Sequence, residues 1–430
     1  MKQSLVVIVS CVAIAILTTA EQARSAGFDN NNVGLRGFAL ATAYHGIADD
    51  GSAIYYNPAG LALIDEGQMN VEAYAYAIFT KFKYSATTPA GTTKAESTEI
   101  PVIPGGFISQ SFDRWGLGLG VFAPYGGGGV VYKDFFTTTG DSLEASAGFF
   151  ALAPSLALEV VRKYLSVGVS PTIYFGVMEN KMNPAEDLTG ETRVTSKNSG
   201  YAGYGASIGL MSAPLPELKI GLTWRTPVKI KMDGTVTTES PRLPEAMKSD
   251  STMKFMLPME LTLGVGVFPI KKLTIGFSAT LIFHGMMDKI TMRTTAMSAT
   301  GQEMEVVTES ETNYKHNFRV ALGVEYEIIK QLAVRAGIQF IQSPTKDKGL
   351  VLTSCDTNQF LPTLGVAWRI VRFLELTVSG EYVMGFERKR ESEMAIPGDT
   401  TGATIPLEEK FDADHWVVLG GLRFYWDFIK

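Results

Sequence analysis

Residues 165–175, LSVGVSPTIYF, decide the fold, because apolar residues alternate with small or polar ones along the stretch. Residues 273–283, LTIGFSATLIF, repeat the pattern. Successive side chains of a β-strand point to opposite faces, so such a segment forms a strand with one apolar face. Both stretches therefore predict strands, and the rest of the chain can be searched for the same period.

The same alternation predicts fourteen strands, separated by connections of two kinds. The strands are expected at residues 68–83, 102–112, 115–125, 143–161, 164–180, 197–212, 218–233, 253–268, 273–290, 312–328, 332–342, 358–370, 373–389 and 412–427. Six connections are short, at residues 113–114, 161–163, 213–216, 269–272, 329–331 and 371–372, and each alternates with a long polar one. Strict alternation of short and long connections is typical of an up-and-down barrel with tight turns at one end.

The width of the barrel predicts which face is apolar. Fourteen strands enclose a space too wide for inward side chains to fill, so we expect the apolar face to contact lipid. Aromatic residues near the strand ends favour the same interpretation, since membrane barrels carry aromatic girdles at both interfaces. They are Trp115, Tyr164, Phe268, Tyr326, Trp368, Phe373 and Trp426 by the short turns, and Tyr125, Tyr174, Phe386 and Trp416 nearer the long connections.

The first residues predict export. Lys2 precedes an apolar run at residues 5–20, which has the length of a signal peptide rather than of a membrane helix. The triplet Ala23-Arg24-Ser25 fits a cleavage site, so residues 1–25 are assigned to a cleaved signal. Cleavage after Ala20 is the alternative.

Cysteine usage and charge exclude several classes of protein. Cys11 follows Ile8-Val9-Ser10, as in a lipoprotein signal, but the apolar run continues past it, which favours ordinary cleavage. The mature chain then keeps Cys355 alone, so a disulfide-stapled scaffold is excluded. The formal net charge of −6 makes nucleic acid an unsuitable partner.

Residues 26–67 precede the first predicted strand and lack strand alternation. Asp49 and Asp50 are placed to cap one short helix, and Asn57 to cap the next with Pro58 at its first position. A barrel of this width is open unless something fills it. We therefore expect residues 26–67 to form a plug of short helices in the lumen and residues 68–430 to form the barrel.

Segments in three parts of the chain resemble those of one known family. Ala26-Gly27-Phe28 and AYHGIADDGSAIYYNPAGLA (43–62) look like the start and plug signature of that family. LKIGLTWRTPVKIKMDG (218–234) is a further match. The third is YKHNFRVALGVEYEI (314–328) followed by LAVRAGIQFIQSP (332–344). Together these segments resemble the FadL/TodX family of outer-membrane transporters for hydrophobic compounds.

The resemblance predicts an all-β fold, a 14-stranded antiparallel transmembrane β-barrel with a small N-terminal plug. It implies passive uptake of long-chain fatty acids or of aromatic or aliphatic hydrocarbons across the outer membrane of a Gram-negative bacterium. It also implies lateral exit through a gap in the wall, periplasmic N and C termini, and a monomer without a cofactor. The implied partners are outer-membrane lipid, lipopolysaccharide and the barrel-assembly machinery. A hydrophilic general porin is the alternative.

The sequence places the wall gap between the second and third predicted strands. The turn at 113–114 sets a register in which Pro104 lies opposite Ala123, and Ile103 opposite Pro124. Proline lacks the N–H that a strand ladder needs, so this seam is expected to pair badly. The predicted seam residues are Pro104, Gly105, Gly106, Gly118, Gly120 and Pro124. Alternatively, the two prolines only mark strand ends.

Cations in the expected lumen-facing phase are candidates for contact with a ligand head group, namely Arg225, Lys315 and Arg319. Lys229 and Lys231 are expected in the same phase as Arg225. No catalytic or metal-binding residue is predicted. Ser207 lies in a G-x-S-x-G-like pattern within a strand rather than at a strand-to-helix turn, and the histidines (His45, His284, His316 and His415) lack metal-ligand spacing.

Overall fold

The computed structural model describes residues 29–64, 67–89, 91–133, 142–182, 192–241, 245–297, 303–350, 356–395 and 404–427. The predicted signal peptide, Cys11 and Cys355 lie outside these residues. No helix in the described ranges is long and apolar enough to cross a membrane.

The chain forms short helical segments followed by one antiparallel sheet. The helical segments are α2 (Leu35–Ala39), α3 (Ala53–Tyr56), η1 (Pro58–Leu63), η2 (His284–Met286) and η3 (Asp347–Gly349). The strands are β1 (Gln68–Thr88), β2 (Gly91–Ser97), β3 (Val102–Phe112), β4 (Trp115–Lys133), β5 (Ser142–Val161), β6 (Leu165–Met182), β7 (Arg193–Leu215), β8 (Leu218–Arg225), β9 (Val228–Glu239), β10 (Met247–Leu257), β11 (Glu260–Ile270), β12 (Leu273–Ile282), β13 (Lys289–Met297), β14 (Glu303–Glu311), β15 (Asn317–Ile329), β16 (Leu332–Ile341), β17 (Gln359–Val371), β18 (Leu374–Gly385), β19 (Arg388–Ala395) and β20 (Thr404–Asp427).

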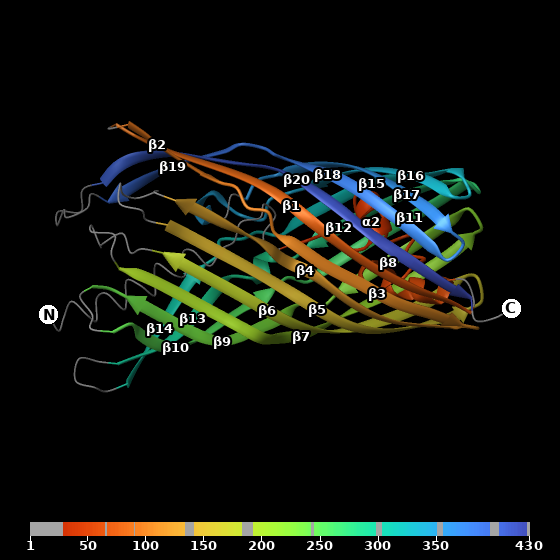
Figure 1. Cartoon of the computed structure of the whole chain (residues 1–430), viewed down its shortest axis with the longest axis horizontal. Coiled ribbons are helices and arrows are strands. Elements are labelled where there is room, and N and C mark those ends of the chain that lie inside the picture. The colour runs from red at the N-terminus through yellow and green to blue at the C-terminus, as the bar shows by residue number, and fades with distance from the viewer. Residues whose placement is uncertain are drawn as a thin grey trace.

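The sheet closes on itself because β1 pairs with β20 over almost its whole length, from Gln68↔Asp427 to Thr87↔Glu408. Six crossing strands consist of two segments each, for example β8 with β9, so the twenty segments make fourteen crossings. The predicted 14-stranded antiparallel barrel is confirmed. Figure 1 shows the short turns at one end of the barrel and the long connections at the other.

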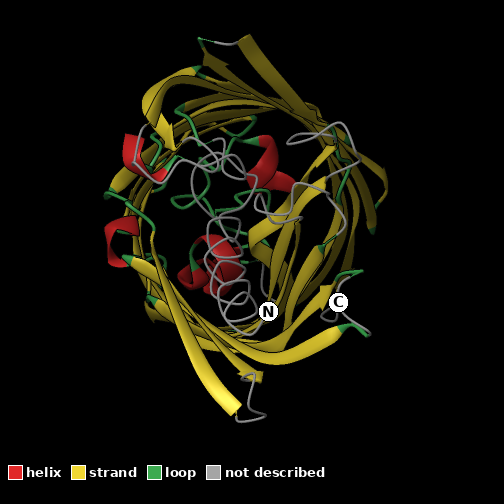
Figure 2. Cartoon of the chain, turned by 90° about the vertical axis from the view of Figure 1, so that its left-hand side faces the viewer, coloured by secondary structure: helices red, strands yellow, loops and turns green. Residues whose placement is uncertain are grey.

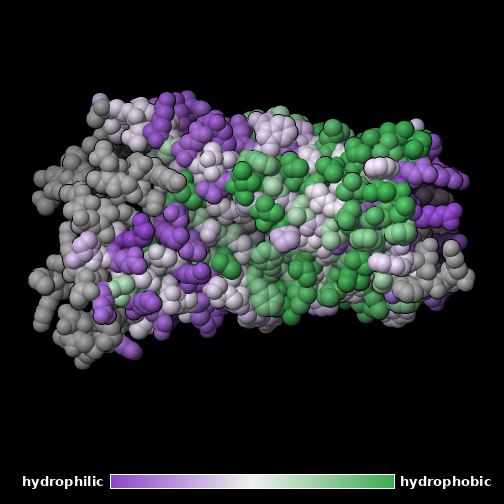
Figure 3. Space-filling view, viewed as in Figure 1, coloured by the Kyte–Doolittle hydropathy of each residue, from purple (hydrophilic) through white to green (hydrophobic). Residues whose placement is uncertain are grey.

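On the face drawn in Figure 3, apolar residues gather in the half next to the short turns and polar residues in the half next to the long connections. On β1 the outward side chains change from Val71 and Ala73 near the turn to Lys81 and Lys83 near the long connections. The inward side chains change in the opposite sense, from Asn70 and Glu72 to Phe82 and Tyr84. The expected apolar outer face therefore holds for the turn half, whereas the loop half is polar outside and apolar inside.

Three predicted girdle residues face the wrong way. Phe268, near the short turns, packs against the buried cluster with Lys219 over its ring. Tyr125 and Tyr174 are buried and point into the lumen, because they lie in the half where the inward face is apolar. Phe386 and Trp416 are exposed on the outside, as a girdle requires.

Lys229 and Lys231 are exposed on the outer face, although the sequence placed them in the lumen with Arg225. The strand is interrupted between β8 and β9 at Thr226 and Pro227. Arg225 and Val228 are both buried, so the interruption shifts the inward phase by one residue. A strand pattern extrapolated across a proline therefore gives the wrong face for every residue beyond it.

The segment 29–64 lies inside the ring of strands, and Figure 2 shows helices within the ring. Its backbone packs against inward glycines of many strands. For example, a Cβ at Gly276 would lie 2.0 Å from the carbonyl oxygen of Ala43, and one at Gly168 would lie 2.3 Å from the carbonyl carbon of Pro58. The other glycines whose Cβ would come within 3.0 Å of this segment include Gly116, Gly209, Gly221, Gly264, Gly323 and Gly337.

Candidate functional site

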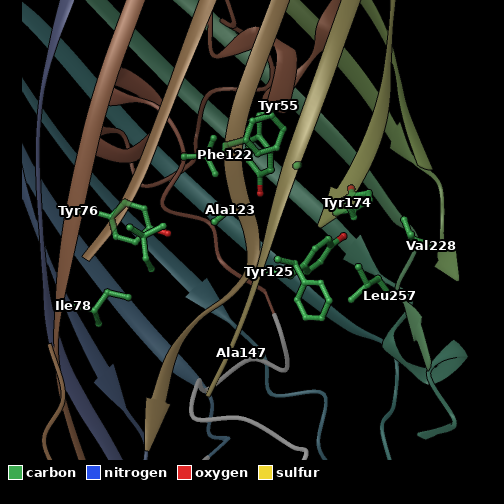
Figure 4. Packing of buried hydrophobic residues seen from close by; sticks show 14 of the residues in the cluster. Tyr55, Tyr76, Ile78, Phe122, Ala123, Tyr125, Ala147, Tyr174, Val228 and Leu257 are labelled. Carbon is green, nitrogen blue, oxygen red and sulfur yellow. The ribbon is translucent and has the colours of Figure 1, made fainter. Parts of the chain in front are cut away.

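The candidate site is the lumen beyond the internal segment, together with the seam between β3 and β4. Tyr55 of α3 makes an edge-on contact with Phe122 of β4 at 5.3 Å between ring centroids, and Phe107 of β3 lies 5.7 Å from Phe122. Further rings and apolar side chains from around the wall face the same space in Figure 4, including Tyr76, Ile78, Tyr174, Val228 and Leu257.

Methionines line the lumen nearer the long connections. Met178, Met182, Met232, Met253 and Met292 are all buried on the inner face. Flexible thioether side chains adapt to ligands of different shape, and an apolar pocket favours hydrophobic ligands. Buried polar side chains such as Asn180, Asn198 and Ser251 lie beside these methionines, so the loop half of the lumen is a mainly apolar surface with separate hydrogen-bonding groups.

Charged residues concentrate around the internal segment, in the half near the short turns. Arg423 of β20 binds the Asp50 carboxylate through Nη2 at 2.6 Å and the Glu72 carboxylate through Nη2 at 2.6 Å and Nε at 3.0 Å. Arg36 bridges Asp49 at 2.5 Å and Glu325 at 2.6 Å. Asp49 thus forms an ion pair within residues 29–64, through Arg36, whereas Asp50 attaches this segment to the barrel wall, through Arg423.

The pKa of Asp50 reflects this environment. Burial alone would raise it, but Arg423 and the hydrogen bonds donated by Ser52 hold the pKa of this carboxyl below its ordinary value. Asp50 is therefore ionised at neutral pH, and its ion pair with Arg423 is fully formed.

Asn57 and Pro58 begin η1 at the wall of the barrel. The Asn57 side chain accepts a hydrogen bond from the Ala59 N–H at 3.2 Å, and Pro58 occupies the first helical position. The Asn57 amide nitrogen also donates to the carbonyl oxygens of Leu210 at 3.0 Å and His45 at 3.2 Å. One side chain thus caps η1 and attaches it to β7.

Two of the three candidate head-group cations are buried and already paired. Arg225 Nη1 lies 2.9 Å and Arg319 Nη2 lies 3.5 Å from the Glu260 carboxylate. Arg225 also stacks over the Tyr55 ring with its guanidinium carbon 4.4 Å from the centroid. Lys315 is exposed, between β14 and β15.

Asp29 lies next to these cations without a hydrogen bond to either carboxylate oxygen in the described structure. Its nearest partners are His284 Nε2 at 3.8 Å and Arg319 Nη1 at 3.9 Å. Burial raises the pKa of the Asp29 carboxyl to about 6, against the lowering influence of His284 and Arg319. Asp29 therefore changes charge near neutral pH.

The ladder between β3 and β4 stops part-way up the wall. It runs from Phe112↔Trp115 to Gly106↔Val121, which is the register that the short turn predicts. Beyond this pair β4 is irregular between Phe122 and Tyr125. The two predicted pairs, Pro104 with Ala123 and Ile103 with Pro124, do not form, because the ladder ends before that level at the bulge in β4. Pro104 is exposed whereas Ala123 and Pro124 are buried.

The beginning of the internal segment takes the place that β3 leaves. Asn30 donates its backbone N–H to the Pro124 carbonyl oxygen at 2.9 Å. Its side-chain amide donates to the Ala123 carbonyl oxygen at 2.7 Å and to the Tyr76 hydroxyl of β1. Buried carbonyl groups of β4 are thereby satisfied without a neighbouring strand.

The gap in the ladder between β3 and β4 ends on the side of the long connections as well as on the side of the short turns. The Val131 N–H of β4 donates to Ser97 Oγ of β2 at 2.8 Å, so the two sides of the seam meet again there. A hollow of about 450 Å³ lies at this level, lined by Ile100 and Ile103 on one side and by Val130, Ala147 and Phe150 on the other. Ile100 and Phe150 are exposed whereas Ile103 and Ala147 are buried, so outward and inward side chains both contribute.

The predicted seam glycines have different surroundings. Gly118 and Gly120 lie in the intact part of the ladder, opposite Ser109 and Phe107. A Cβ at Gly118 would lie 2.7 Å from Ile54 Cδ1, so this glycine makes room for the internal segment. Gly105 and Gly106 pair with Tyr74 and Ala73 of β1.

Sequence reasoning missed Asp29, Asn30 and Glu260. Asp29 and Asn30 lie in a polar stretch without a recognisable motif, and their partners lie between 46 residues (Tyr76) and several hundred residues away along the chain. Glu260 follows Pro258, where the inward phase changes as it does at Pro227: Leu257 and Glu260 are both buried. A proline within an expected strand was the available signal for that change.

The described residues hold no group of three or more His, Cys, Asp or Glu side chains arranged for a metal ion.

Residues 16–426 match the family model described as "Outer membrane protein transport protein (OMPP1/FadL/TodX)". The chain belongs to this family. It is thus an outer-membrane β-barrel of a transporter family for hydrophobic compounds.

Curated members of the OMPP1/FadL/TodX family align along nearly the whole chain. "Outer membrane protein P1" of Haemophilus influenzae is 24% identical, with 97% of this chain and 99% of that protein covered. The "Long-chain fatty acid transport protein" of Escherichia coli (strain K12) is 22% identical over 87% of this chain and 92% of its own length.

Solved structures show the same fold. A FadL homologue of Pseudomonas aeruginosa superposes with a TM-score of 0.77 at 17% identity, covering 94% of this chain and 100% of that chain. The P. putida toluene transporter TodX gives a TM-score of 0.70 at 14% identity, with 93% and 100% covered.

Proposed function

We propose that this protein is an outer-membrane channel for passive uptake of hydrophobic small molecules, which leave sideways through the seam between β3 and β4. Residues 26–67 act as the plug, and the short turns and both termini face the periplasm. The partners are the hydrophobic ligand, outer-membrane lipid and lipopolysaccharide, and the barrel-assembly machinery inserts the chain as a monomer.

The observation that carries the proposal is the hollow at the interrupted ladder. Apolar side chains from both faces of the wall line it, and the charged side chains Glu99, Glu144, Glu179 and Lys181 line it as well. A ligand gains about 0.8 kcal/mol per CH₂ group that it removes from water. A route from the lumen through a window with apolar lining side chains into lipid keeps part of that gain, which a route through the aqueous periplasm would lose.

The buried cations support neutral compounds as the substrate class. Arg225 and Arg319 share the Glu260 carboxylate, so a ligand carboxylate has to compete with a buried partner already in place. Asp29 adds a second negative charge at neutral pH. Lys315 is exposed outside this cluster. Aromatic or aliphatic hydrocarbons need no such exchange of ion pairs.

The lateral route is tested by filling the window. Ser146 of β5 lines the hollow, so Ser146→Trp should reduce uptake of toluene at least tenfold in a Gram-negative host without channels of its own, and leave toluene binding to the purified protein intact. Leu156→Trp, on the lipid-facing side of the same strand, is the matched control and should transport normally. Normal uptake by folded Ser146→Trp protein would reject lateral exit, and permeation of sugars through the wild type would support a hydrophilic porin.

A further inference from the structure

Three lysines lie together on the outer surface where the apolar belt ends. On β8 and β9 the outward side chains run Ile220, Leu222, Trp224, and then Lys229 and Lys231. On the neighbouring strand the outward Met256 is followed by Lys254. The same change from apolar to polar surface crosses the barrel in Figure 3. The three lysines thus lie just beyond the edge of the belt.

The strand register brings their charges together. Lys231 lies directly opposite Lys254, and Lys229 lies opposite Met256. Like charges directly opposite each other destabilise a pair of strands. The arrangement therefore costs stability unless an anion lies between the ammonium groups.

Six other outward basic residues in the loop half have a carboxylate partner. These ion pairs are Lys81–Glu96, Lys83–Asp412, Lys181–Glu144, Lys197–Glu179, Lys289–Glu309 and Arg293–Glu305, at 2.8 to 3.7 Å. No carboxylate of the described residues lies within 4.0 Å of the ammonium groups of Lys229, Lys231 or Lys254. Asp233, the nearest acid along β9, instead accepts a hydrogen bond from Thr252 at 2.7 Å.

The height of the three lysines matches a lipid head group. Trp224 marks the membrane interface, which indole rings prefer. Lys229 lies five residues beyond it, or about 12 Å higher with a rise of about 3.3 Å per residue and a strand tilt of about 40°. A lysine stem can lie along the apolar edge while its ammonium group reaches the phosphate layer.

Two exposed tyrosines extend this surface. β7 pairs with β8 at Ser207↔Arg225 and with β9 at Asn198↔Gly234, and both pairs follow the same register. Continuing this register between the two pairs puts Tyr201 level with Lys231. Tyr201 is 55% and Tyr204 76% exposed, so both hydroxyls are free to hydrogen-bond to a sugar or a phosphate beside the lysines.

We infer that Lys229, Lys231 and Lys254 bind a phosphate group of the phosphorylated glycolipid of the outer leaflet, the lipid A part of lipopolysaccharide. The phosphate offsets the repulsion between Lys231 and Lys254, and its position in the membrane plane selects a lipid rather than a soluble anion. The inference rests on the proposed orientation, with the long connections facing outward, and names the surface that contacts the lipid.

The test is a binding titration of the purified full-length protein with bisphosphorylated lipid A, followed by native mass spectrometry at about 0.15 M salt, where long-range attraction is screened. The variant K229Q/K231Q/K254Q should bind lipid A about a hundredfold more weakly, at roughly fivefold per lysine. The matched control K81Q/K83Q/K289Q removes three paired lysines and should bind within a few-fold of the wild type. K229R/K231R/K254R should retain binding.

Each outcome decides the proposal. Equal binding by the wild type and K229Q/K231Q/K254Q, or an equal loss in both glutamine variants, would overturn it. Displacement of lipid A by millimolar inorganic phosphate would show a site for any phosphate instead of a lipid site. Heat-modifiable migration on gels checks that each barrel is folded. The titration reports lipid binding and not transport, so failure of this inference leaves the channel proposal standing.

Discussion

Arg423→Ala should loosen the internal segment from the barrel wall. Arg423 is buried and holds two carboxylates, Asp50 of the internal segment and Glu72 of β1, at 2.6 Å each. Removing one partner of a buried ion pair leaves uncompensated charge and costs about 3–5 kcal/mol. Since each 1.4 kcal/mol is a factor of ten, docking should weaken by about 10²- to 10⁴-fold.

Hydrogen exchange measures this loss directly. The Asn57 N–H bonds to the Ala53 carbonyl oxygen at 2.9 Å, so the peptide spanning residues 49–60 reports whether the segment is docked. Its protection should fall by the stated factor in Arg423→Ala, and single-channel recordings should show openings that the wild type lacks. Deletion of residues 30–64 gives the conductance of the fully open barrel as a positive control.

Two variants separate the ion pair from other effects. Arg369→Ala removes a half-exposed cation 3.7 Å from Glu375 at the same end of the barrel, and exposed pairs contribute only about 0–1 kcal/mol. It should leave protection unchanged. The neutral variant Arg423→Gln/Asp50→Asn/Glu72→Gln should recover most of the protection. Unchanged protection and a closed trace in Arg423→Ala would refute the reasoning.

Two further predictions concern the cluster around Asp29. The pKa of the Asp29 carboxyl is about 6 in the docked segment and 3.8 when the segment is undocked and solvated. As pH rises, the carboxyl therefore ionises in the undocked state before it ionises in the docked state. Docking accordingly weakens as pH rises from about 4 to about 6, by about 3 kcal/mol in total. Asp29→Asn should remove this dependence, seen as equal exchange of the Asn30 amide at pH 5 and pH 8 after correction for intrinsic rates; a pH-dependent difference that persists in the variant would contradict it. If the substrates are neutral, Arg319→Gln should lower toluene and oleate uptake by the same factor, whereas a loss confined to oleate would assign Arg319 to a carboxylate head group.

Local pattern was enough to predict the barrel. Alternation along each strand is a property of neighbouring residues, and a two-residue turn sets the register of the strands that it joins. The turn at 113–114 therefore predicts the ladder from Phe112↔Trp115 to Gly106↔Val121 without information on any other contact. The resemblance in residues 43–62 likewise agrees with the family that the chain belongs to.

Alternation could not say which face of a strand meets lipid, and only the closed barrel decided that. The two faces exchange character half-way along β1, and the phase shifts by one residue at Pro227 and again at Pro258. The two-residue period of a strand does not reveal such a shift, so extending it past Pro227 predicts Lys229 and Lys231 in the lumen. Their position on the outer surface follows from the ladder between β9 and β10.

The seam depended on contacts between distant residues. Its sequence signal was two prolines, but its geometry comes from the bulge at Phe122 and from Asn30, which bonds to the carbonyl groups of Ala123 and Pro124. Asn30 and Pro124 are far apart along the chain and meet only because the strands enclose the N-terminal segment. The local chain thus determined where strands form and how neighbours begin to pair, while closure of the barrel around that segment determined which pairs break and which charges are buried.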